Sequence, residues 1–288
     1  MKITQSLPVL IYEPAKSGLR SVNWRELWEY RELLYFLTWR DVKIRYKQAA
    51  LGVAWAVLQP VFTMVIFSVI FGSLVNVSSD GIPYPVFSYV ALLPWQFFAG
   101  SLSRAGNSLV ANSNLLTKIY FPRLVIPLSA IGAGLVDFVI SFVVLLGLML
   151  FYRITPTWAV VTLPLFILLA ALTALAVGLW LSALDVQYRD FEYAIPFIIQ
   201  AWMYASPVVY SVKVIPQGIG RLLYGLNPMA GVIQGFRWAL VGGAPPMPSS
   251  SLPAWPISAV WKNPSPTLYK KFSHEFHELT RILLKSYI

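Results

Sequence analysis

The chain has 288 residues, of which 57% are hydrophobic and 12% are charged, and its mean hydropathy is +0.65. A soluble core of this size cannot bury so much apolar surface, so the composition excludes a soluble globular protein and predicts an all-α integral membrane protein. The formal net charge of +10 would suit nucleic-acid binding in a soluble protein, but here Lys and Arg lie mostly between apolar runs, so we expect a membrane partner and no nucleic acid.

The first predicted element is an amphipathic helix over residues 25–47, inside a cytoplasmic N-terminal unit of residues 1–50 that lacks the pattern of a signal peptide. Aromatic residues recur on one side of this helix, and cations gather on another. One interpretation, favoured by composition alone, is an anchor that lies among lipid headgroups. The other is that the cations contact the phosphates of a lipid-linked substrate at the entrance of a pathway. They are Arg40, Lys43, Arg45 and Lys47.

Residues 51–210 are predicted to hold five transmembrane helices. No residue from Leu51 to Val75 is charged, and this run exceeds the roughly 20 residues that a helix needs to cross hydrocarbon. Lys and Arg are frequent in the first 50 residues and in the 101–124 loop, but the 75–83 loop has none, so the N-terminus is predicted to be cytoplasmic. The predicted spans are residues 54–74, 84–100, 126–152, 158–183 and 193–210.

Beyond the fifth predicted span, residues 211–246 contain two apolar pieces, 219–226 and 229–241, which are interrupted by Arg221 and Arg237. Neither piece is long enough to cross a bilayer, so this unit is predicted to be re-entrant or interfacial at the outer face. Residues 247–288 form an atypical tail that is rich in Pro and Ser at its start and basic afterwards.

No catalytic or metal-binding constellation emerges from the sequence. His274 and His277, the two histidines, lie in the atypical tail and are interpreted as part of a solvated segment. Asp185 and Asp190 would be the carboxylates of a membrane-embedded glycosyltransferase, but Arg189 lies between them. An ion pair that fixes this predicted loop is the simpler explanation. The chain contains no cysteine, which excludes disulfides and thiolate metal sites.

Asp137 is the one charged residue inside the five predicted spans, whereas ion-coupled carriers usually need several such groups. We expect Asp137 to hydrogen-bond a neighbouring helix. Aromatic side chains in or beside the spans suggest a surface on which sugar rings stack, and the alternative is ordinary packing at the membrane interface. These aromatics are Trp55, Phe62, Trp95, Phe98, Trp202, Tyr204 and Tyr210.

Four segments occur in order along the chain: WRDVKIRYKQAALGVAWAVLQP, NSNLLTKIYFPRLVIPLSA, VQYRDFEYAIPFIIQ, and SPVVYSVKVIP followed by LNPMAGVIQGFRWAL. Together they resemble the membrane subunit of polysaccharide exporters of the ABC-2 type, over about residues 25–246. The resemblance implies a multi-pass inner-membrane permease that exports O-antigen, capsule or teichoic-acid-like polysaccharide on a lipid carrier. It also implies a homodimer and a sixth helix after the re-entrant unit, which is missing or replaced by the atypical tail.

The chain has no G-x-x-x-x-G-K-S/T phosphate loop, so the resemblance implies that a partner ABC ATPase binds ATP and Mg²⁺ and that this chain holds no cofactor and no metal. The 101–124 loop corresponds to the family's coupling element, and the alternative is an ordinary basic loop. A permease for a lipid or drug, or a membrane-embedded glycosyltransferase of the same pathway, remains an alternative function. The implied ATPase contacts are Asn114, Leu116, Lys118, Tyr120 and Arg123.

Overall fold

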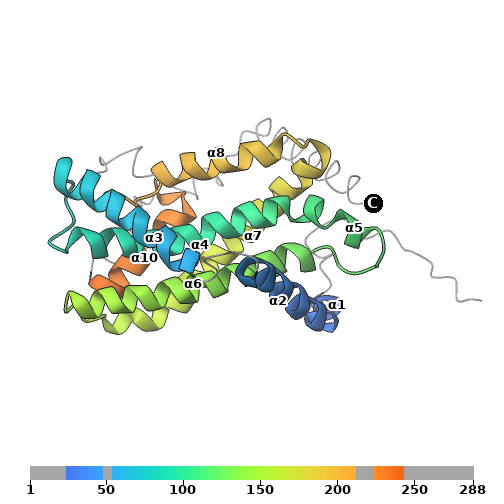
Figure 1. Ribbon diagram of the computed structural model, residues 1–288, viewed down its shortest axis with the longest axis horizontal. Coiled ribbons are helices and arrows are strands. Elements are labelled where there is room, and N and C mark those ends of the chain that lie inside the picture. The colour runs from blue at the N-terminus through green and yellow to red at the C-terminus, as the bar shows by residue number, and fades with distance from the viewer. Residues whose placement is uncertain (1–23, 48–53, 212–223, 243–288) are drawn as a thin grey trace, which may run out of the picture.

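The computed structural model describes residues 24–47, 54–211 and 224–242 (Figure 1). Within these residues every regular element is a helix, which confirms the predicted all-α class. Two helices precede the apolar spans, α1 (Trp24–Glu29) and α2 (Arg31–Lys47), so the predicted helix over 25–47 is present with a break at Tyr30. Four later helices are long and apolar enough to cross a membrane, namely Ala54–Leu74, Tyr84–Ala111, Val125–Phe151 and Trp158–Gln187.

Two of the predicted spans match the structure to within one residue. The first consists of α3 (Ala54–Phe67), which continues into the π-helix η2 (Ser68–Leu74), where Val75 N–H donates to the carbonyl of Ile70 at 2.9 Å. The third is α6 (Val125–Phe151). Both are long apolar runs, and the single charge of Asp137 in the third does not interrupt its pattern, so sequence alone locates them.

The central helix, α4 (Tyr84–Ala111), is longer than the span predicted over residues 84–100. Pro94 lies inside it without ending it, and the polar stretch that follows residue 100 stays helical because α6 and α7 cover it. Ser101 and Ala105, for example, are fully buried. The prediction of a loop that begins at residue 101 is therefore wrong, and Arg104 belongs to a buried helix.

The fourth span begins with the 3₁₀ turn η3 (Trp158–Thr162) and continues as α7 (Leu163–Gln187), past the predicted end at residue 183. Asp185 therefore lies in the last turn of a helix, where it is 2% exposed and accepts a hydrogen bond from the backbone N–H of Glu192. Among the described residues it forms no ion pair with Arg189, so the predicted ion pair of a loop is wrong. Asp185 instead holds the start of the next helix.

That next helix, α8 (Phe191–Tyr204), has 14 residues and is shorter than the fifth span predicted over 193–210. A helix of this length reaches about 21 Å, less than the roughly 30 Å of hydrocarbon in a bilayer. Turns follow from residue 205 to residue 210, around Pro207. The described part of the chain thus has four helices of spanning length, not five, and α8 lies along one side of them (Figure 1).

The last described helix, α10 (Pro228–Val241), confirms the second short apolar piece. The side chain of Asn227 caps it, and it ends at Gly242, whose φ of 72° suits a residue without a side chain. The helix packs on α4, α7 and η3, so it is buried in protein and does not lie at a surface. Residues 219–223 with Arg221, the tail with His274 and His277, and the expected sixth helix fall outside the described residues.

Arg237 projects from α10 into the protein and not toward lipid. Its guanidinium donates to the carbonyls of Val208 at 2.9 Å and Tyr210 at 3.1 Å, and it lies 3.7 Å from the ring centre of Phe87. Carbonyl dipoles and the face of an aromatic ring both stabilise a desolvated cation. Arg237 therefore joins α10, α4 and the turn after α8.

A close helix contact joins α4 and α7 at Gly178, where a Cβ atom would lie 2.7 Å from the Cβ of Ala105. Small residues let two backbones approach in this way. Gly178→Ala should force the two helices apart at a cost of roughly 1–3 kcal/mol. We expect a lower thermal unfolding temperature for the detergent-solubilised chain.

Gly147→Ala is the matched control, because Gly147 also lies in an apolar helix but has no atom within 4 Å of its would-be Cβ. Both changes gain the same helix propensity, so the difference between them measures packing alone. Equal unfolding temperatures for the two variants would contradict the tight α4–α7 contact.

Candidate functional site

A cavity of about 530 Å³ lies between α2, α3, α4 and α6. Its size falls within the range of ligand pockets, and its wall combines charged, amide and aromatic groups. The lining residues are Arg45 and Tyr46 on α2, Trp55, Ala56, Gln59 and Pro60 on α3, Leu93, Gln96, Phe97, Ala99, Gly100 and Arg104 on α4, and Gly134, Asp137, Phe138 and Ser141 on α6.

Asp137 is the centre of an ionic cluster in this cavity. Arg45 donates a hydrogen bond to one of its carboxylate oxygens and the hydroxyl of Tyr46 donates to the other. Arg104 Nη1 lies 3.7 Å from the oxygen that Arg45 binds. Asp137 thus contacts neighbouring helices, as predicted, and the cluster carries two positive charges and one negative charge.

Tyr46 acts in this cluster as a neutral donor. Burial and then the hydrogen bond to Asp137 raise the pKa of its hydroxyl well above the ordinary value for tyrosine. The hydroxyl therefore stays protonated under physiological conditions, and it holds the carboxylate in place without adding charge.

Two glycines make room for the guanidinium of Arg104. A Cβ atom on Gly134 would lie 2.4 Å from Arg104 Nη2, and one on Gly100 would lie 3.1 Å from Nη1. Arg104 Nε donates to the carbonyl of Ala130 at 3.3 Å. The position of the Arg104 guanidinium therefore depends on glycines at residue 100 of α4 and residue 134 of α6, because a side chain at either would crowd it.

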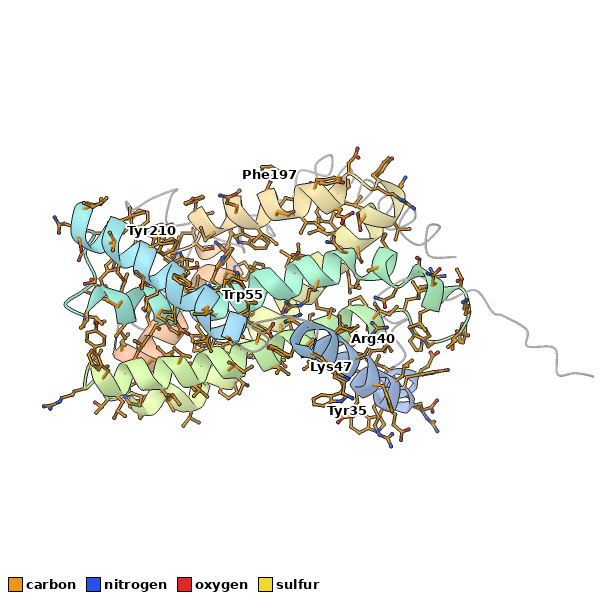
Figure 2. The ribbon with its side chains drawn as sticks, viewed as in Figure 1. Tyr35, Arg40, Lys47, Trp55, Phe197 and Tyr210 are labelled. Carbon is orange, nitrogen blue, oxygen red and sulfur yellow. The ribbon has the colours of Figure 1, made fainter. Side chains whose placement is uncertain are left out.

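The four predicted headgroup cations on α2 do not form one surface. Arg45 turns inward to Asp137, and Arg40 donates to Asp41 and, at 2.9 Å, to the Oδ1 of Asn112. Lys43 and Lys47 are exposed, and Lys43 lies 5.6 Å from the ring centre of Trp39. Figure 2 shows Arg40 and Lys47 along α2, with Trp55 near the end of that helix.

Most of the aromatic face predicted for this helix is exposed, including Trp28, Tyr35 and Trp39, as an interfacial helix requires. Val42, an apolar residue at the same helical spacing, is instead buried against the bundle. Close approach of α2 to α6 is possible at Gly132, where a Cβ atom would lie 3.0 Å from Thr38 Oγ1. The helix thus has one face toward the protein and one face outward.

A second, smaller hydrophobic core joins α2 to the segment that follows α4. Leu37 of α2 packs with Leu109, Phe121, Val125 and Ile126. The contact between Arg40 and Asn112 lies at the same place, where α4 ends and α5 (Ser113–Leu116) begins. A movement of α2 would therefore be transmitted directly to residues 112–126.

The predicted ATPase contacts in this segment differ in exposure. Asn114, Lys118 and Arg123 are exposed, and so are Tyr120, at 66%, and its neighbour Ile119, at 57%. Leu116 is half-buried and packs against the second core, so its role includes holding the segment. We name residues 113–123 the α5 segment. Figure 1 shows α5 at the same end of the molecule as α1 and α2.

The predicted pathway aromatics are spread over several places. Trp95 and Phe98 are buried in the main core, where Phe98 meets Trp202 edge to face with ring centres 5.0 Å apart. Such burial leaves no surface on which a sugar could stack, so these residues are packing residues in this conformation. Trp55 lines the cavity, Phe62 and Tyr204 are exposed elsewhere, and Tyr210 lies toward the opposite end from α2 (Figure 2).

Sequence reasoning missed Arg104, Gln59, Gln96 and Phe97 as cavity residues. Arg104 was placed in a loop, and uncharged residues within a span carry no signal by themselves. The sequence feature that comes closest to indicating this site is the pair Gly100 and Arg104. They lie one helical turn apart, so a cation and a position without a side chain share one face of the helix. Among the described residues no cluster of three or more His, Asp or Glu side chains is arranged to hold a metal ion.

Comparison with known proteins gives a family and several relatives. The family described as ABC-2 type transporter matches residues 32–241. An O-antigen export system permease protein RfbA from Myxococcus xanthus is 34% identical over 215 residues, which are 74% of this chain and 82% of that protein. One of the same name from Klebsiella pneumoniae is 31% identical, with 74% and 81% covered. The polysialic acid transport protein KpsM from Escherichia coli is 26% identical, with 71% and 79% covered.

The ionic cluster predicts an unequal response to neutralisation. Asp137→Asn leaves Arg45 and Arg104 facing each other without a counter-charge, whereas Arg45→Gln leaves Asp137 with Arg104 and Tyr46. We expect Asp137→Asn to lower the unfolding temperature more than Arg45→Gln. The free energy of unfolding that the double variant loses should be smaller than the sum of the losses in the two single variants, with a coupling energy of roughly 0.5–3 kcal/mol. Additive losses would show that Arg45 and Asp137 do not stabilise each other.

Proposed function

The chain belongs to the ABC-2 type transporter family, and we propose that it is the membrane permease subunit of an ATP-driven exporter that moves lipid-linked polysaccharide across the cytoplasmic membrane. The observation that carries the proposal is the similarity to permeases named for O-antigen export, which extends over most of this chain and most of those relatives. Four apolar helices of spanning length and a cation-rich helix beside a cavity are features that such a permease needs.

Energy for transport comes from a separate ABC ATPase subunit, because this chain has no phosphate loop of its own. That partner binds ATP and Mg²⁺, and this chain needs no cofactor or metal for its part. Two copies of the chain form the permease, with the N-terminus in the cytoplasm. The grouping of α1, α2 and α5 at one end supports this orientation, because that end holds the basic N-terminal helix (Figure 1).

The substrate approaches along α2. Lys43 and Lys47 are exposed and suited to attract the headgroup phosphates of a lipid carrier, since Arg40 and Arg45 already contact protein groups. Polysaccharide follows its carrier past aromatic side chains, and of the seven aromatics predicted for the pathway Trp55 lines the cavity.

The α5 segment couples this chain to the ATPase. Ile119 and Tyr120 project from it, while Phe121 is buried in the second core and holds it against α2. Exposed apolar side chains on a firmly anchored segment are typical of an interface. Because the same core contains Leu37 of α2, the ATPase contact and the substrate approach share one piece of structure.

Deleting the gene in its host tests the function and separates it from the alternatives. An export permease predicts that surface polysaccharide disappears while finished lipid-linked polymer accumulates inside, measured by immunoblot of whole and fractionated cells. A glycosyltransferase would leave no finished polymer anywhere. A lipid or drug permease would leave surface polymer normal, and either result would overturn the proposal.

The same strain tests the approach along α2. Wild-type chain should restore surface polymer, and Lys43→Gln with Lys47→Gln should restore less of it at an equal amount of membrane-inserted protein. Arg25→Gln is the control, because Arg25 is highly exposed and its one ion pair with a described residue is to Glu29, at 3.7 Å. Equal restoration by all variants would remove Lys43 and Lys47 from the pathway.

Tyr120→Asp should weaken co-purification with the ATPase by about tenfold or more, because an unpaired charge in a packed interface costs several kcal/mol. Tyr35→Asp is the matched control, since Tyr35 on α2 has the same exposed fraction, 66%. Tyr120 is preferred to Leu116 because Leu116 also packs in the second core. Undiminished co-purification of the Tyr120 variant would place the contact elsewhere.

A further inference from the structure

The cavity between α2, α3, α4 and α6 has more positive charge than its own structure requires. Arg45 and Arg104 share the one carboxylate of Asp137, and the other described residues that line the cavity are uncharged. Residues 48–53, which join α2 to α3, include no charged residue that would balance the surplus. An unbalanced cation in a partly dry site is costly, and an anionic ligand removes that cost.

Both guanidinium groups have donors to spare. Arg45 makes one side-chain hydrogen bond to a described residue, and so does Arg104, although each carries five N–H donors. The 3.7 Å separation between Arg104 Nη1 and Asp137 is longer than a hydrogen bond. Two forked donors that face one space suit the tetrahedral oxygens of a phosphate.

The rest of the cavity wall suits the hydrocarbon chain and the polar headgroup atoms that are attached to a lipid phosphate. Phe97 and Phe138 supply an apolar side, and the amides of Gln59 and Gln96 supply polar groups. The volume accommodates a headgroup and the first part of its chain.

We propose that this cavity binds the phosphate of an anionic lipid through Arg45 and Arg104, and that Asp137 is the internal anion which the phosphate replaces. The inference rests on the proposed function, since the lipid carrier of the polysaccharide is the expected source of that phosphate. It places the recognition site deeper than the exposed Lys43 and Lys47. Asp137 holds α2 against α6 through Arg45 and Tyr46, so a phosphate that takes its place loosens that attachment.

The test is calorimetric binding to the full chain in nanodiscs of neutral phosphatidylcholine. Farnesyl pyrophosphate is the lipid-phosphate probe, and inorganic pyrophosphate and farnesol are probes of the anion alone and the lipid alone. We expect farnesyl pyrophosphate to bind and the other two to bind at least tenfold more weakly. Equal binding of inorganic pyrophosphate would overturn the lipid assignment. Loss of binding in nanodiscs that contain phosphatidylglycerol would assign the site to bulk phospholipid and overturn the carrier assignment.

Variants give the decisive signs. Arg104→Gln should weaken binding of farnesyl pyrophosphate about tenfold to a hundredfold, since charge-assisted hydrogen bonds to phosphate are lost. Asp137→Asn should tighten binding several-fold, because it removes the competing carboxylate. A purely structural role for Asp137 would instead weaken binding, and that result in a folded variant would overturn the proposal. Arg25→Gln should leave binding unchanged.

Gly134→Ala keeps every charge and serves if a charge variant does not fold. Its methyl group would occupy the space of the Arg104 guanidinium, so it should weaken binding at least several-fold. Wild-type affinity in both Gly134→Ala and Arg104→Gln would remove Arg104 from the site. This binding experiment and the gene deletion can fail independently. Binding of farnesyl pyrophosphate together with normal surface polymer in the deletion strain would refute the export function but not the phosphate site.

Discussion

Charge inside an apolar bundle has to be compensated locally, and the structure is organised around the compensation of Asp137. Asp137 lies on α6, and its partners come from two other helices, with Arg45 and Tyr46 on α2 and Arg104 on α4. Each contact fixes a helix that packing alone would leave free to slide, because apolar side chains have no directional preference. The position of α2 against the spans follows from this cluster together with the close approach at Gly132.

The same helix is fixed a second time at its middle. Arg40 binds Asn112, and Leu37 belongs to the small core under the α5 segment. One rigid helix thus has one attachment at the cavity and another at the segment proposed to meet the ATPase. Two attachments on one rigid element are what coupling between distant sites requires, provided that one attachment has two states. The ionic cluster is suited to be that attachment, because a stronger anion can take the place of Asp137.

The sequence identifies uniform apolar runs well and polar helices poorly. The first and third spans are predicted to within one residue because their ends are abrupt changes in polarity. The end of α4 is not, since its residues after 100 look like a loop until α6 and α7 are seen to cover them. Asp185 was misplaced for the same reason.

About half of the candidate site could be predicted from the sequence. Asp137 was singled out and Arg45 was grouped with the correct helix, but their meeting depends on how α2 lies on α6, and local sequence does not encode that placement. Arg104 is not predicted as a site residue, because the sequence predicts a loop where α4 continues. The shortness of α8 was not foreseen either, because the residues after Tyr204 remain apolar even though they form turns.

The environment of Arg237 has a consequence for biosynthesis. A lone arginine in a 14-residue helix opposes transfer into lipid by roughly 2.5–3.5 kcal/mol, and the helix is too short to be threaded across as an independent unit. The groups that offset this cost, the ring of Phe87 and the carbonyls of Val208 and Tyr210, lie earlier in the chain. The segment therefore enters the protein interior only after the translocation machinery has released the preceding helices. Its docking becomes a late step that reports whether the earlier part of the chain has assembled.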